Sequence, residues 1–65
     1  MTFALMKFIL EQMESRGIGD KADIEAYPTD RGYIVTACQF TENGYLNIVC
    51  KYEDGDLIIN ETKGV

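Results

Sequence analysis

The sequence predicts an α+β fold in which one N-terminal helix packs on one face of a four-stranded antiparallel β-meander, in the order α-β-β-β-β. Apolar residues near the N-terminus recur with helical spacing. The rest of the chain contains four stretches that are rich in β-branched and aromatic residues or alternate with period two, separated by glycine-containing turns. The 65 residues form a single small domain, 1–65, with a small stability margin.

Residues 2–16 are predicted to form an amphipathic helix. Thr2 is a suitable N-cap, and Gly17 is a suitable left-handed residue to end the helix. The apolar stripe expected to face the core contains Leu5, Met6, Ile9, Leu10 and Met13, with Phe3 at its edge. Phe8 projects about 100° from this stripe. We expect it to be either a flank contact with the sheet or an exposed anchor.

A central hairpin is predicted from strands 33–41 and 45–52. A two-residue type I′ turn at Asn43-Gly44 would mix apolar and polar residues on each face, so a three-residue loop with Gly44 in a G1 bulge is preferred. This register pairs Phe40 with Leu46, Cys38 with Ile48, Thr36 with Cys50, and Ile34 with Tyr52. One face of the hairpin then becomes almost wholly apolar and is assigned to the core.

The stretch 22–28 alternates with period two and is predicted to be a half-buried strand, which Pro28 restricts to an edge or a strand end. The same three-residue logic at turn 30–32 aligns Ile24 with Cys38, Ala26 with Thr36, and Pro28 with Ile34. The alternative is a three-stranded sheet in which 22–28 is extended but unpaired.

The last strand is predicted from about Asp56 to Glu61, after a type I′ turn at 54–55, with a short tail behind it. This register pairs Leu57 with Tyr52, Ile59 with Cys50, and Ile58 with Lys51. The first two pairs face the core, and the third faces outward.

Enzymatic activity is not expected. The chain has no histidine, its only serine is Ser15, and Cys38 and Cys50 are predicted to lie diagonally on the core face as reduced thiols. The carboxylates of Glu53, Asp54 and Asp56 at a hairpin tip are only a weak signal for a divalent cation. No cofactor is predicted, and one helix on a short sheet leaves little volume for a small-molecule substrate.

The charge balance excludes further partners. Eleven acidic against six basic residues give a net charge of −5, which repels nucleic-acid backbones and anionic membrane surfaces. No apolar run approaches the roughly 20 residues of a membrane span, and no signal-peptide pattern appears. We therefore expect a cytoplasmic protein without direct nucleic-acid or membrane contacts.

The leading functional hypothesis is a small acidic protein-protein interaction module. The face opposite the helix is predicted to carry Tyr27, Tyr33, Val35, Ala37, Tyr45, Val49 and Ile58 within a polar rim. An apolar centre with tyrosines is typical of protein interfaces, although valine and tyrosine are also favoured in strands for their β-propensity. Such a face would serve self-association as a homodimer or docking on a partner.

A second hypothesis is an acidic inhibitor that occupies a basic, nucleic-acid-binding surface of a host protein. Small size and negative charge are shared with phage or mobile-element inhibitors such as anti-CRISPR proteins and DNA mimics, an analogy without a motif. The candidate acidic contacts are Asp23, Glu25, Glu42, Glu53, Asp54 and Asp56.

Overall fold

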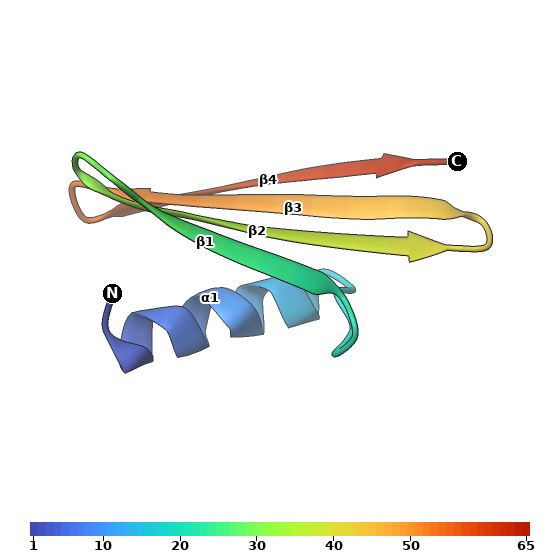
Figure 1. The fold of residues 1–65 in the computed structure, drawn as a ribbon, viewed down its shortest axis with the longest axis horizontal. Helices are drawn as coiled ribbons and strands as arrows, with labels where there is room; N and C mark the ends of the chain where they lie inside the picture. The colour runs from blue at the N-terminus through green and yellow to red at the C-terminus, as the bar shows by residue number, and fades with distance from the viewer.

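The computed structural model describes residues 1–65 and confirms the order α-β-β-β-β (Figure 1). The elements are α1 (Phe3–Ser15), β1 (Asp23–Thr29), β2 (Gly32–Thr41), β3 (Gly44–Glu53) and β4 (Asp56–Gly64). The strands form one antiparallel sheet in chain order, with β1 paired to β2. The alternative with an unpaired first strand is therefore wrong, and Pro28 lies on an edge strand as predicted. The single helix is neither long nor apolar enough to cross a membrane.

Both ends of α1 are capped by the predicted residues. The hydroxyl of Thr2 accepts a hydrogen bond from the backbone N–H three residues on, at 3.1 Å. Gly17 has φ +107°, and the N–H groups of Gly17 and Ile18 donate to the carbonyls of Glu14 and Met13, each at 3.1 Å. This Schellman arrangement turns the chain so that Ile18 returns to the core beside Met13.

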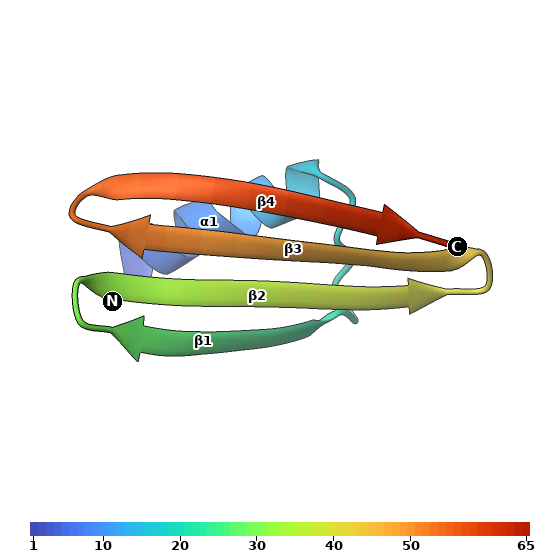
Figure 2. The same cartoon turned by 90° about the horizontal axis from the view of Figure 1, so that it is seen from above.

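The core lies between α1 and the sheet. Its buried side chains are Ile9, Met13, Ile18, Val35, Ala37, Ile48 and Cys50. Ile9 is at the centre of the buried helix face, while Leu10, which the sequence placed in the core stripe, is 40% exposed. Phe8 is also exposed. Figure 2 shows α1 behind β3 and β4, whereas β1 lies at the opposite edge with no helix behind it.

The β3–β4 hairpin has the predicted register. Tyr52 pairs with Leu57, Cys50 with Ile59, and Lys51 with Ile58. Asp54 and Gly55 have φ values of +53° and +85°, as a type I′ turn requires. The strand continues to Gly64, beyond the predicted end at Glu61.

The two registers predicted for β2 are wrong by one residue. Against β3, Phe40 pairs with Tyr45, Ala37 with Ile48, and Val35 with Cys50. Against β1, Ala37 pairs with Ile24 and Val35 with Ala26. A one-residue slip moves every side chain to the other face, so β2 is inverted relative to the prediction.

The cause is a shared Thr-x-x-Gly pattern at both turns of β2. The loops contain two residues, closed by the pairs Thr29–Gly32 and Thr41–Gly44. In each loop the threonine hydroxyl accepts a hydrogen bond from the N–H two residues on, at 3.4 Å and 3.2 Å. Threonine first and glycine fourth suit a type I turn, and the loop residues have no positive φ. Glycine therefore begins the next strand instead of forming a bulge.

Candidate protein interface

The side of the sheet away from α1, which we call the open face, carries large apolar side chains from all four strands. From the registers, these are Tyr27, Ile34, Cys38, Phe40, Tyr45, Val49 and Ile58. Phe40 is 77% exposed and Ile58 is 56% exposed. No other element covers them, because α1 lies on the opposite side (Figures 1 and 2).

The predicted interface is only partly on the open face. Tyr27, Tyr45, Val49 and Ile58 lie there as expected. The predicted placement of Tyr33, Val35 and Ala37 is wrong, because all three project toward the helix side. Val35 and Ala37 are fully buried in the core, and the Tyr33 hydroxyl accepts a hydrogen bond from the N-terminal amino group of Met1.

Sequence reasoning missed Ile34, Cys38 and Phe40 at this surface. The signal that could have found them was the threonine at the start of each turn, since it fixes loop length and hence the face of every β2 residue. Cys38 and Cys50 consequently lie on opposite faces, which corrects their predicted position on one face. Both thiols are free, and burial raises the pKa of Cys50, with a smaller opposing effect from Arg16.

The apolar residues gather toward both ends of the open face. Near the β3–β4 turn, a cross-strand row runs from Tyr27 through Ile34 and Lys51 to Ile58. Toward the β2–β3 turn, Phe40 pairs with Tyr45. Between these groups lie smaller or polar side chains, namely Thr36, Cys38, Asn47, Val49 and Asn60. The open face therefore carries large apolar side chains at its two ends and shorter or more polar side chains in the middle.

The acidic candidates surround this face in three places. Asp23 and Glu25 project from β1, Glu42 lies in the β2–β3 turn, and Glu53, Asp54 and Asp56 lie at the β3–β4 turn. Two of them are paired within the chain, since Glu53 lies 3.4 Å from Lys51 and Asp54 lies 3.3 Å from Arg31. The others form no ion pair with a lysine or arginine.

Tyr27 is oriented by its neighbour on the same strand. Its hydroxyl donates a hydrogen bond to the carboxylate of Glu25. This hydrogen bond, helped by partial desolvation and the negative charge of Glu25, raises the pKa of the phenol. The Tyr27 phenol therefore loses its proton only at a higher pH than an ordinary tyrosine does.

The carboxylates and thiols are dispersed over the structure. No group of three or more of the side chains that usually ligate metals comes together in the structure, including the predicted cluster at the β3–β4 turn. The open face thus carries apolar, aromatic and polar side chains, with acidic residues around it. No protein family, curated protein or solved structure matches this chain.

Proposed function

We propose that this chain is a non-enzymatic protein-interaction module that binds another protein chain through its open face. The observation that carries the proposal is the exposure of apolar side chains from four adjacent strands on a sheet that is covered on one side only. Large exposed apolar patches on small soluble proteins mark interaction sites. Aromatic and aliphatic side chains at both ends of the face, with acidic residues around it, are residue types that such a surface combines.

A second copy of the chain is the occupant that we infer. Only seven residues are buried in this 65-residue chain, so its own core is small. Packing two open faces back to back adds a second hydrophobic layer. The whole molecule extends 37 Å by 16 Å in the plane of the sheet, so the open face offers at most about 600 Å² in projection on each copy (Figure 2). Two such faces are large enough to supply the roughly 1,000 Å² of total buried surface expected of a specific interface.

The direct test is the mass in solution, measured by light scattering at low and at high salt. The wild-type chain is expected to be a dimer at both, because burial of apolar surface depends weakly on salt. Val49→Asp places a charge in the middle of the open face and should give a monomer with an unchanged circular dichroism spectrum.

Ala4→Asp is the matched control for that experiment. It adds the same charge to the first turn of α1, where an acidic side chain is compatible with the helix dipole and far from the open face. This variant should remain dimeric. A monomeric wild-type chain, or a dimer that survives Val49→Asp, would overturn self-association through this face.

A second candidate function is inhibition of a basic, nucleic-acid-binding protein. It is favoured by the four predicted acidic contacts that lack an ion pair, Asp23, Glu25, Glu42 and Asp56. This function predicts that the chain displaces nucleic acid from its target and that affinity falls steeply with salt. Affinity that is independent of salt would contradict it.

A further inference from the structure

The helix side of β1 is exposed at the edge of the sheet. Ile24, Ala26 and Pro28 project to this side, but none is buried, and Ile24 is 41% exposed. In Figure 2 the helix lies behind the other half of the sheet, which explains the exposure. β1 therefore offers a free edge together with an uncovered inner face.

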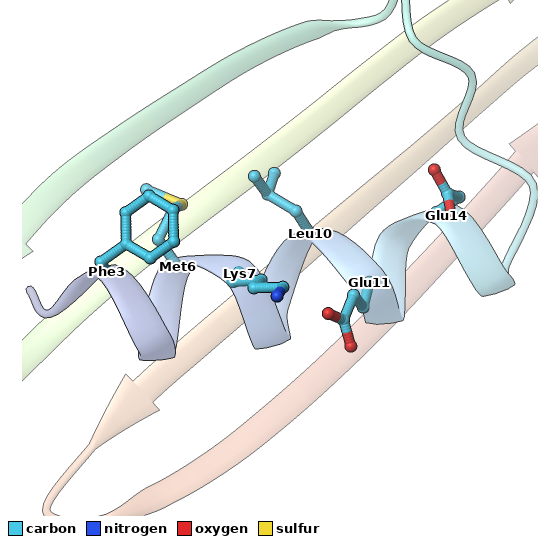
Figure 3. A pocket seen from close by; sticks show the side chains of 6 residues that line it. All are labelled: Phe3, Met6, Lys7, Leu10, Glu11 and Glu14. Atoms are coloured by element: carbon cyan, nitrogen blue, oxygen red, sulfur yellow. The ribbon is translucent and has the colours of Figure 1, made fainter.

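Two hollows lie along the flank of α1 and its connection to β1. The first, of about 270 Å³, is lined by Phe3, Met6, Lys7, Leu10, Glu11 and Glu14, with the rings and chains of Phe3 and Leu10 projecting the same way (Figure 3). The second, of about 240 Å³, lies between Leu10, Ile18 and Ile24. Leu10 and Glu14 line both. The second hollow thus reaches from α1 to Ile24 of β1.

The backbone of β1 can accept another strand. Antiparallel pairs alternate between residues that exchange hydrogen bonds and residues that do not. The pair Thr29–Gly32 closes a two-residue loop, so these two residues exchange backbone hydrogen bonds. By alternation, Pro28, Ala26 and Ile24 form no backbone hydrogen bonds with their partners on β2. Their backbone groups point away from β2. The outward N–H and C=O groups of Ile24 and Ala26 are consequently open to an added strand, while Pro28 limits its length.

Most charges around this edge are negative, although Lys21 lies two residues before the start of β1. Glu11 and Glu14 border the first hollow, Asp20 lines the second, and Asp23 and Glu25 project from the other face of β1. None of these five carboxylates takes part in the four ion pairs of the chain. The only basic residue lining either hollow is Lys7. The edge is thus complementary to a cationic segment.

We propose that β1 binds an extended segment of a partner protein in which apolar and basic residues alternate. The segment pairs with the outer edge of β1. Its apolar side chains lie beside Ile24 and Ala26 toward Leu10, and its basic side chains lie beside Asp23 and Glu25 on the opposite face. This is strand addition, in which the backbone supplies affinity and the alternating side chains supply specificity. The segment occupies the outer edge of β1 and borders the open face through Asp23 and Glu25.

The probe is a fluorescein-labelled seven-residue peptide in which lysine alternates with valine and leucine, titrated at constant salt. Two comparison peptides keep its length: one groups the apolar residues together, and the other replaces each lysine with glutamate. Anisotropy should give at least tenfold weaker binding for each comparison peptide. Equal binding of the glutamate peptide, or of the grouped one, would overturn the proposal.

Ala26→Pro separates strand addition from simple attraction between charges. It removes an outward N–H without changing the net charge, and it repeats a residue that β1 already accommodates at Pro28. Binding of the alternating peptide should fall at least tenfold, with the fold retained by circular dichroism. Unchanged binding would contradict the proposal.

Ile58→Lys, on the open face of β4 and away from β1, is the control for position, and its affinity for the peptide should change by less than tenfold. A tenfold loss in this variant would place the peptide on the wrong surface. Light scattering of Ala26→Pro should give the wild-type mass, because the substitution affects the edge of β1 and not the packing of two open faces. Peptide binding therefore tests strand addition, and the mass in solution tests self-association.

Discussion

The two faces of the sheet are similar in composition but differ in what covers them. Val35 and Ile48 project beneath α1 and are fully buried, while Ile34 and Val49, their chain neighbours, project to the open face and remain half-exposed. Residue type therefore does not distinguish core from surface in these central strands. The register does, because it decides which alternate residues meet the helix.

The largest effect should come from placing the same charge on each face. Val35→Asp buries a carboxylate with no partner and should cost about 4 kcal/mol or more, enough to unfold so small a domain. Within the monomer, Val49→Asp should cost about 1 kcal/mol, because water still reaches that side chain. Urea unfolding of protein dilute enough to be monomeric measures both. Similar losses for the two variants would contradict the assigned faces.

The two sides of the helix extend the comparison to smaller changes. Ile9→Ala leaves a cavity at the centre of the core and should lower the free energy of unfolding by about 2–4 kcal/mol. Leu10→Ala removes a side chain that is already 40% exposed, so the loss should stay below about 1 kcal/mol. Thermal and urea unfolding check both values. A larger loss for Leu10→Ala would restore the helix orientation predicted from sequence.

The smallest effect concerns the turn that sets the register. Thr41→Val keeps the shape of the side chain but removes the hydroxyl, which accepts from the N–H of Asn43 and donates to the carbonyl of Gly44. The expected loss is about 0.5–1 kcal/mol, because both hydrogen bonds are exposed to water. Chemical denaturation measures it, with Thr62→Val on the open face as control because the Thr62 hydroxyl makes no hydrogen bond within the chain. Equal losses of stability in Thr41→Val and Thr62→Val would show that the Thr41 hydroxyl does not stabilise the turn that sets the register.

The fold was predictable because the strongest local signals agree with it. Helical spacing, the caps at Thr2 and Gly17 and the Asp54-Gly55 turn all act between near neighbours in sequence. The face of β2 was not predictable from hydrophobicity, since both sets of alternate residues are largely apolar. Which face each β2 residue occupies depends on hydrogen bonds to the hydroxyls of Thr29 and Thr41. A pattern of apolar residues contains no information about these hydrogen bonds.

For the same reason, only part of the candidate interface could be predicted from the sequence. Residues on β1, β3 and β4 were placed correctly because their strands alternate more clearly or adjoin the well-defined turn. On β2, by contrast, the predicted contacts Tyr33, Val35 and Ala37 lie on the helix side, and Ile34, Cys38 and Phe40 lie on the open face instead. The acidic residues could be found from sequence as a set, but the free edge of β1 depends on where the helix lies across the sheet.

The most direct test of the central claim is the alkylation rate of Cys38, followed by mass spectrometry over a range of protein concentrations. Cys38 lies on the open face, whereas Cys50 is buried and its raised pKa keeps it as the unreactive thiol. If two open faces pack together, the rate at Cys38 falls as concentration rises, while Cys50 stays unmodified throughout. A rate at Cys38 that is the same at every concentration would contradict the account.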